Sequence, residues 1–503
     1  MAVKLYPVQE TMKAETGYRV RINGIEATLD AARVSRVPYN RRWPGHQRDV
    51  SQTELAAFLS FATDGPVDVE IEAEEAFEKV VVRPLSLGIM PEAEGNTIRF
   101  RMEKAAYVSV EPYGRRNALH LFADEMKTFD VRPEDEGVIY YGPGVHDAGM
   151  IEMTSGQTLF IDEGAVVYAC IHAIDAENIR IIGHGILDNS RNKAVIHYEV
   201  NAECNDSAIN NATRLHTVQL EYCTNVLIDG ITIRDSLVYN VRPVGCKNLE
   251  IRNVKIIGCW RFNSDGIDMH NCENVLIENC FLRTFDDSIC IKGFDCYYDG
   301  DVEAAVHAAM YRGGKAYDVF RNVLVRRCVV WNDWGKCLEI GAETRAEEIC
   351  DVVFEDCDVI HVTGAVLDCM NVDYADVHEI TWRNIRVEYD EVIPELKLQD
   401  WDAVKYEETD RDPDFAPQLI RAEVMYHHEY SSRGDRRGRN RNLLFEDIHV
   451  TGRQMVKMGF EGIDGEHACS DVTVRRIFRN GEPVRFADGQ VHIDPVCRNI
   501  RIE

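Results

Sequence analysis

The sequence contains no long hydrophobic run. No segment approaches the roughly eighteen uninterrupted apolar residues that a membrane-spanning helix needs, and the first twenty residues, MAVKLYPVQETMKAETGYRV, lack the apolar stretch of a signal peptide. These absences argue against a membrane protein. They also lead us to expect a cytoplasmic location.

Cysteine is missing from the first third of the chain. All 16 cysteines lie between Cys170 and Cys497, and they form no CxxC pair and no Cys/His cluster with zinc-like spacing. Without an export signal, free thiols that act as small apolar core residues are favoured over disulfides. We therefore expect no bound metal and no cofactor.

Positive charge is scarce. Lys and Arg total 56 against 85 Asp and Glu, which gives a formal net charge of -29. Nucleic acid and anionic membranes would be repelled, so neither is expected as a partner. A neutral ligand meets no such barrier, and a homo-oligomer stays open.

The first part of the chain alternates short β-prone runs with turns, which is typical of an antiparallel β-sandwich. One stretch, Thr53 to Phe61, has apolar residues spaced three and four apart and predicts a helix packed on that sandwich. The predicted strands are Tyr18 to Ile22, Val67 to Ile71, Lys79 to Arg83, Thr97 to Arg101 and Ala106 to Val110.

From about residue 140 a short phrase recurs, in which an asparagine is followed by alternating β-branched or other apolar residues. Successive copies lie 23, 26 and 48 residues apart, the last being about two periods. A period in the low twenties without helical stretches predicts a right-handed parallel β-helix, with the asparagines in an internal ladder at a turn. We expect an all-β chain with a β-sandwich domain over 1–135 and a β-helix domain over 136–503. The phrase begins at Asn178, Asn225, Asn248, Asn274, Asn322, Asn442 and Asn499.

Two segments of neighbouring coils can be superimposed: residues 263–270, NSDGIDMH, and residues 285–292, FDDSICIK. Their inward apolar residues then coincide. We expect this register because a slip by one residue would bury charged side chains. In this register Asp265 stacks on Asp287, with Asp286 beside them, and the three carboxylates converge on one outer face. Stacked like charges repel, so folding alone gives no reason for the cluster.

Such a cluster suits hydrolysis of a glycosidic bond, in which one carboxyl group protonates the leaving oxygen and others activate a water. Calcium ligation or turn formation would be the alternative for a lone pair of aspartates. A non-catalytic carbohydrate-binding solenoid, and a lyase or transferase on the same fold, also stay open.

The two segments resemble the NTDGxD and DD signatures of the polygalacturonase family, glycoside hydrolase family 28. Residues 183–188, GHGILD, are similar to the GxGxxD segment of that superfamily, and the likeness spans about residues 140 to 390. The resemblance implies an inverting hydrolase in which Asp286 is the general acid and Asp265 with Asp287 holds the nucleophilic water. Asn263 would orient that group, and Asp268 would support it.

Further residues are expected to bind the carbohydrate. They are His270, Lys292, Trp334, Lys336, Glu339 and Asp368. Two of them depart from the family pattern. Lys336 stands where a histidine is expected, and Asp368 stands where the family has a cation that binds the carboxylate of a uronic acid.

An anion in place of that cation disfavours a galacturonan, so a neutral and α-linked oligosaccharide becomes the expected substrate. Polygalacturonase activity on oligogalacturonides is the alternative. The preceding sandwich resembles the family 49 dextranases and isopullulanases. An insertion at 294–319 would close one end of the cleft and make the enzyme exo-acting.

Overall fold

The computed structural model describes most of the chain. The described residues are 2–10, 16–36, 50, 53–191, 216–261, 263–294, 318–389, 417–427, 431, 434–487 and 489–503. The predicted insertion at 294–319 falls mostly on residues 295–317, which lie outside this set.

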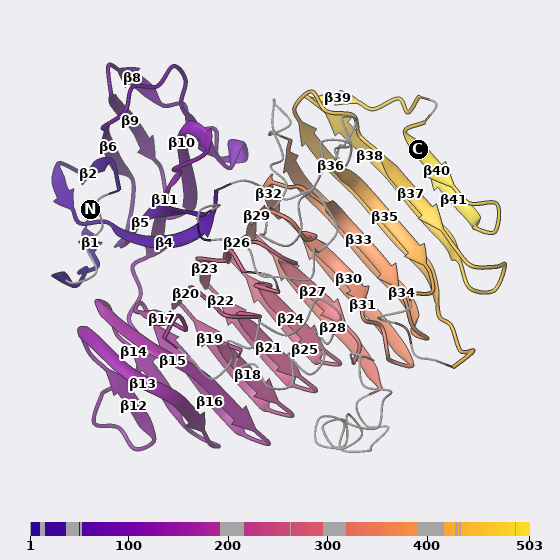
Figure 1. The fold of residues 1–503 in the computed structure, drawn as a ribbon, viewed down its shortest axis with the longest axis horizontal. Helices are drawn as coiled ribbons and strands as arrows, with labels where there is room; N and C mark the ends of the chain where they lie inside the picture. The colour runs from indigo at the N-terminus through magenta and orange to yellow at the C-terminus, as the bar shows by residue number, and fades with distance from the viewer. Residues whose placement is uncertain are drawn as a thin grey trace.

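The N-terminal part is a β-sandwich of two sheets, as the sequence predicts (Figure 1). One sheet consists of β1 (Val3–Leu5), β4 (Asp30–Ser35), β5 (Thr53–Thr63), β7 (Val81–Arg83), β10 (Tyr107–Arg115) and β11 (Leu119–Glu125). The other consists of β2 (Tyr18–Ile22), β3 (Ile25–Ala27), β6 (Val67–Ala73), β8 (Glu92–Glu94) and β9 (Thr97–Met102). A short 3-10 helix, Leu85–Leu87, follows β7.

The predicted helix at Thr53 to Phe61 is wrong, because this stretch is strand β5 at the centre of the first sheet. Its two faces are both buried. Ala57 and Leu59 point into the sandwich core, whereas Ala56 and Phe58 belong to the cluster that packs on the solenoid. A strand buried on both sides is apolar along its whole length, so the apolar spacing of a helix and of this strand cannot be told apart.

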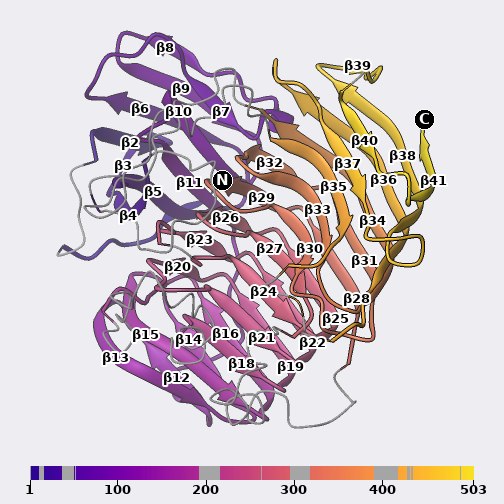
Figure 2. The ribbon, with the colours of Figure 1, turned by 45° about the vertical axis from the view of Figure 1, so that its right-hand side comes forward.

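From Val138 onward the described residues form a right-handed parallel β-helix, which confirms the predicted fold (Figures 1 and 2). Up to β32 (Asp358–His361), each full coil contributes one strand to each of three stacked sheets. In the later coils one long strand replaces two of these, because β34 (Asp376–Glu388) pairs with both β31 (Glu348–Glu355) and β32. The solenoid begins with four strands that precede the regular three-sheet pattern. They are β12 (Val138–Tyr141), β13 (Gly144–Met153), β14 (Thr158–Ile161) and β15 (Ala165–Ile174).

We name the three sheets by what they carry. The site sheet holds β18 (Val218–Glu221), β21 (Val241–Val244), β24 (Ile267–His270), β27 (Ile289–Lys292), β30 (Leu338–Ala342), β33 (Ala365–Asn371), β35 (Gln418–Val424), β37 (Met458–Glu461) and β40 (Val491–Ile493). The sandwich-facing sheet holds β17 (Ile186–Asp188), β20 (Thr232–Arg234), β23 (Lys255–Ile257), β26 (Phe281–Thr284), β29 (Val329–Asn332) and β32 (Asp358–His361).

The third, outer sheet holds β16 (Glu177–Gly183), β19 (Thr224–Asp229), β22 (Lys247–Arg252), β25 (Glu273–Glu278), β28 (Val319–Arg326), β31 (Glu348–Glu355), β34 (Asp376–Glu388), β36 (Arg439–Thr451), β38 (Cys469–Arg479) and β41 (Arg498–Ile502). A two-residue strand, β39 (Glu482–Pro483), pairs antiparallel with β38.

The repeated asparagines stack on one another, as predicted, and lie at the second position of outer-sheet strands such as β16, β19 and β22. Asn225 donates its side-chain amide to Asn178 at 2.9 Å, and Asn248 donates to Asn225 at 2.8 Å. These three residues have φ near +55 to +57°, a left-handed conformation that asparagine tolerates well. The ladder is exposed and lies on the outside of the solenoid, so its predicted internal position is wrong. Its amides satisfy each other at the surface, and apolar side chains fill the cylinder.

Cysteines occupy that interior. Cys223, Cys246 and Cys272 immediately precede strands of the outer sheet on three successive coils, and all three belong to the main apolar cluster. This agrees with the reading of cysteine as a small apolar core residue.

The sandwich packs on the sandwich-facing sheet through an apolar cluster that contains Phe58, Phe122, Phe281 and Trp331. Buried ion pairs surround this cluster. Lys255 lies 3.1 Å from Asp124 and is 1% exposed.

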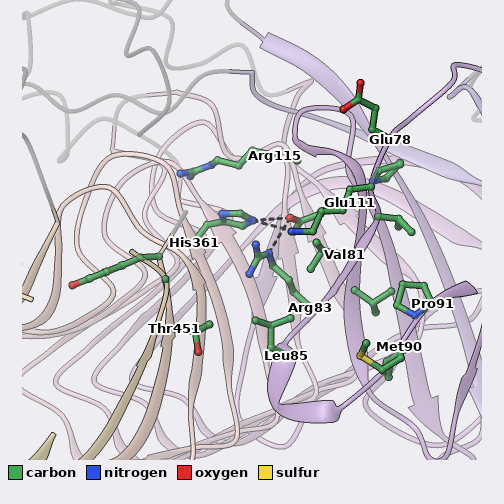
Figure 3. Close-up of a pocket in the computed structure, with 18 of the residues that line it drawn as sticks. Glu78, Val81, Arg83, Leu85, Met90, Pro91, Glu111, Arg115, His361 and Thr451 are labelled. Atoms are coloured by element: carbon green, nitrogen blue, oxygen red, sulfur yellow. Dashed lines mark hydrogen bonds and ion pairs between the residues drawn. The ribbon is translucent and has the colours of Figure 1, made fainter. Parts of the chain in front are cut away.

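A second group of buried charges lies at the floor of a cavity of about 830 Å³ between the two parts (Figure 3). There the Nε of Arg83 lies 3.0 Å from Glu111, and Glu111 also contacts His361 of the solenoid at 3.0 Å. The interface therefore depends on compensated buried charge as well as on apolar contact.

Among the described residues, no helix is long and apolar enough to cross a membrane.

Replacing Asp124 by asparagine should destabilise the protein by about 3–5 kcal/mol, because Lys255 stays buried without its counter-charge. Urea unfolding followed by circular dichroism measures this loss. Asp68→Asn is the matched control, since it removes one carboxylate partner of the exposed Arg101 and should leave the unfolding midpoint unchanged. Equal effects of the two substitutions would contradict the role of the buried pair.

Candidate active site

The register of two neighbouring strands brings the predicted acidic residues together. Ile267 of β24 pairs with Ile289 of β27, as the sequence overlay predicts. Just before these strands, the backbone N–H of Gly266 donates to the carbonyl of Asp287 at 2.8 Å, which sets Asp265 beside Asp287. One carboxylate oxygen from each of Asp265, Asp286 and Asp287 lies within 4.8 Å of the others.

Asp286 is held by hydrogen bonds from its surroundings. Its carboxylate accepts the backbone N–H of Asn263 at 3.2 Å and that of Asp287 at 3.0 Å. The side chain of Asn332 donates to the backbone carbonyl of Asp286 at 2.7 Å. Asn263 thus contacts the site through its backbone, and Asn332 is a supporting residue that the sequence interpretation missed.

Lys292 lies at the centre of the cluster. Its ammonium group is 3.6 Å from both Asp265 and Asp268, 3.8 Å from Asp287 and 3.5 Å from Glu343. The side chain is only 4% exposed, so Lys292 is a buried counter-charge and not a solvated surface lysine. Glu343 was not predicted, because it follows strand β30, two coils away from Asp265, and only the fold brings it to Lys292.

Lys336 supplies a second positive charge. Its backbone N–H donates to Asp287 at 3.0 Å, and its ammonium group lies 3.2 Å from Asp287 and 2.8 Å from Glu339. Gly335 makes this contact possible, because a Cβ there would lie 2.5 Å from the backbone of Asp286. The chain can therefore approach the two aspartates closely enough for the N–H to bind.

The environment separates the pKa values of the two adjacent aspartates. Burial, followed by the charge of Asp287, raises the pKa of Asp286 to about 8. Burial would also raise the pKa of Asp287, but Lys336 and Lys292 together lower it to about 2. At neutral pH this arrangement offers a protonated carboxyl group next to an ionised one, which suits an acid and a base.

Burial raises the pKa values of three other acids in the cluster. Burial and the neighbouring Asp268 raise the pKa of Asp265 well above its usual range, and burial raises the pKa of Asp268. Burial and Asp287 likewise raise the pKa of Glu339. Asp287 is thus the acidic group of this cluster whose pKa is lowered.

The cluster is more enclosed than expected. Asp265, Asp286 and Asp287 point away from the apolar core, as predicted, but they are 2%, 8% and 5% exposed. The expectation of a solvent-facing group is wrong in this respect. Low exposure strengthens the electrostatic interactions within the cluster, because little water screens them.

Asp368 does not present a free negative charge. It is fully buried, and Arg421 from the next coil binds it with two hydrogen bonds of 2.7 and 2.6 Å. Asp368 follows Glu339 along the column of outward side chains, and Arg421 follows Asp368. The expectation of an unbalanced anion at this position is therefore wrong, and Arg421 is a cation that the sequence interpretation missed.

Two other predicted residues lie near the cluster. His270 is buried opposite Lys292 in the register, and its Nδ1 lies 3.1 Å from the carbonyl of Gly293. Burial, followed by the charge of Arg242, lowers the pKa of His270 well below its usual value. Trp334 is half-buried, and its ring lies 5.5 Å from that of Phe285.

The three aspartates have the oxygen ligands that a hard cation such as Ca²⁺ prefers. However, Lys292 and Lys336 already compensate two of these carboxylates, Asp265 and Asp287, at 3.2 to 3.8 Å. A cation between the aspartates would be repelled by both ammonium groups, so the donor set fits proton transfer better than metal binding.

Comparison with known proteins finds a family similarity over the coils that carry this site. Residues 150–390 match the model of Glycosyl hydrolases family 28. A probable polygalacturonase of Vitis vinifera is 28% identical over 147 residues, which are 27% of this chain and 27% of that protein. An exopolygalacturonase of Oenothera organensis is 29% identical over 114 residues, 22% of this chain and 30% of that protein. The matched segments thus span less than a third of either relative.

Among solved structures, Dex49A from Penicillium minioluteum shares the fold over 99% of this chain and 95% of its own, with a TM-score of 0.61 and 16% sequence identity. The comparisons therefore confirm that residues 150–390 resemble glycoside hydrolase family 28, on a sandwich-and-solenoid fold that the chain shares with Dex49A.

Proposed function

We propose that this protein is an inverting glycoside hydrolase that trims neutral, α-linked oligosaccharides from one end. The observation that carries the hydrolase proposal is the contrast between two adjacent carboxyl groups, with the pKa of Asp286 raised to about 8 and that of Asp287 lowered to about 2. The family 28 similarity over the same coils supports it.

In this proposal Asp286 donates its proton to the glycosidic oxygen as the bond to the anomeric carbon breaks. A water molecule attacks that carbon, and Asp287 accepts the proton that the water loses. Asp265 holds the water by a hydrogen bond. Lys292 and Lys336 keep Asp287 ionised until the transfer occurs. Proton exchange with solvent then restores the starting state of both aspartates.

Inversion rests on the family 28 resemblance. Inverting enzymes usually separate acid and base by about 6.5–9.5 Å, whereas the nearest oxygens of the three aspartates lie within 4.8 Å here. The anomer that forms first, observed by proton NMR, tests this part of the proposal, and a retained anomer would refute it.

The charges beyond the aspartates support a neutral substrate. Lys336 is paired with Glu339, and Arg421 is paired with Asp368 and lies 3.4 Å from Glu423. Each cation along this column is thus already compensated by a carboxylate, so an anionic sugar gains little from them.

Polygalacturonase activity is an equally supported second candidate. Both curated relatives described above are polygalacturonases by name, and one is an exopolygalacturonase. The side chain of Arg421 is 27% exposed, and it could serve as a cation for a uronic acid if the sugar carboxylate competes with Asp368. The exo-acting part of the proposal draws on the name of the second relative.

Asp286→Asn should lower turnover of an unactivated oligosaccharide by about 10²–10⁴-fold, since the leaving oxygen loses its proton donor. The loss should be much smaller for a nitrophenyl glycoside, whose leaving group needs no proton. Initial rates on both substrates measure the difference. Asp175→Asn, at an exposed turn of the same solenoid, is the matched control and should keep full activity. Full activity of Asp286→Asn on the oligosaccharide would refute the assignment, and a non-catalytic solenoid would show no activity in any variant.

The pH dependence of kcat/KM should be bell-shaped. The acid must be protonated, so activity falls as the pH rises through about 8, and the base must be ionised, so activity falls as the pH drops through about 2. Lys336 lowers the pKa of both aspartates, so Lys336→Gln should move both limbs to higher pH. Lys247→Gln, which removes a cation of the outer sheet, should leave both limbs in place. Limbs that do not respond to Lys336→Gln would contradict the assignment of acid and base.

Asp368→Asn should shift substrate preference toward acidic sugars. It removes the two hydrogen bonds that Asp368 accepts from Arg421 and leaves Glu423, at 3.4 Å, as the carboxylate beside that guanidinium. A gain of about 1.4 kcal/mol for a uronate would correspond to a tenfold change. The ratio of kcat/KM for an oligogalacturonide to that for its neutral counterpart measures this shift. Asp376→Asn, at a carboxylate of the outer sheet that also binds arginines, should not change the ratio. A wild-type protein that already prefers the oligogalacturonide would favour the second candidate.

A further inference from the structure

Two adjacent strands of the outer sheet bring metal-binding side chains together, away from the acidic cluster of the site sheet. Cys350 of β31 pairs with His378 of β34 on the next coil, and Glu348 lies two residues before Cys350. Strands β31 and β34 lie side by side in Figures 1 and 2. A carboxylate oxygen of Glu348, the sulfur of Cys350 and a ring nitrogen of His378 all lie within 4.8 Å of one another.

The histidine is oriented from both sides. Its Nε2 lies 2.7 Å from Glu348, and its Nδ1 contacts the carboxylate of Glu379. Metal-binding histidines commonly donate their second ring N–H to such a carboxylate, which fixes the ring and makes the other nitrogen a better ligand. Glu379 is therefore placed to support a metal bound at Nε2.

From this arrangement we propose that Glu348, Cys350 and His378 form a binding site for a zinc ion. Oxygen, sulfur and imidazole nitrogen are the ligands that Zn²⁺ takes in proteins, and three protein ligands leave a fourth position open. Asp351 lies next to that position, because its carboxylate is 3.6 Å from the sulfur of Cys350. A water molecule or Asp351 completes the tetrahedron.

The charges around the site favour a cation. Glu348, Asp351 and Glu379 supply three carboxylates within this group. Arginines flank it in the register on either side, Arg321 on the preceding coil and Arg441 on the following one.

Each of these arginines already binds another carboxylate. Arg321 binds Glu273 at 3.0 Å, and Arg441 binds Asp376 at 2.9 Å. Both arginines are therefore shared with carboxylates outside the site, and the charge of Arg441 also acts on Glu379.

The proposed zinc site is partly open to solvent, and a bound ion would stabilise the fold. Cys350 is buried, at 4% exposure, whereas the side chain of Glu348 is 40% exposed and opens the site to solvent. A bound ion would join two successive coils of the solenoid by bonds between side chains. Because it binds the folded chain and not the separated coils, it would raise the unfolding temperature.

Isothermal titration calorimetry of the chelator-treated full-length protein with Zn²⁺ tests the proposal. One site per chain is expected, and Cys350→Ser and His378→Ala should each abolish it. Co²⁺ in place of Zn²⁺ should give a near-ultraviolet thiolate-to-metal absorption band that Cys350→Ser removes. Glu379→Gln should weaken binding by about 10–100-fold, as loss of a supporting carboxylate does.

Cys497→Ser is the matched control, because among the described cysteines Cys497 is the one that is partly exposed and it lies outside the proposed site. It should bind zinc as the unchanged protein does. Asp286→Asn should also retain binding, which separates this site from the acidic cluster. Binding that survives in both Cys350→Ser and His378→Ala, or no binding to the unchanged protein at millimolar Zn²⁺, would overturn the proposal.

Discussion

The register between neighbouring coils is the constraint on which the rest of this structure depends. Inward side chains such as Ile267 and Ile289 must stack to fill the cylinder, and a shift of one residue would turn every side chain to the opposite face. Once the apolar residues are aligned, the same register places Asp265 beside Asp287. The same register sets Cys350 beside His378 on a different sheet. Packing of the core thus places polar groups that have no part in that packing.

The acidic cluster is tolerated because buried cations accompany it. Lys292 contacts four carboxylates, and Lys336 binds Asp287 through both its backbone and its side chain. These cations are unequally distributed, so one aspartate is held ionised while Asp286 beside it keeps its proton at neutral pH. Because the group is buried, little solvent screens this difference.

The sandwich packs against the sandwich-facing sheet of the solenoid and shares an apolar cluster with it. Strand β5 is apolar on both sides because it belongs to two cores at once, and buried charges such as Lys255 and Asp124 join the two parts. Trp331, next to the site in sequence, is fully buried in this interface, where the guanidinium of Arg283 lies 3.9 Å from its ring. Of the two tryptophans before Lys336, Trp334 is the one that stays partly accessible.

The sequence by itself determined the solenoid, its register and the meeting of Asp265, Asp286 and Asp287, because a repeat of alternating apolar residues has one arrangement that fills its interior. Only the tertiary structure decided which charges are compensated. Arg421 neutralises Asp368 from 53 residues away, and Glu343 reaches Lys292 across a coil. It also decided that Thr53 to Thr63 is a strand, since burial on both faces erases the alternation that marks one. Such contacts join residues whose spacing carries no local pattern, so they exist only once the coils are stacked.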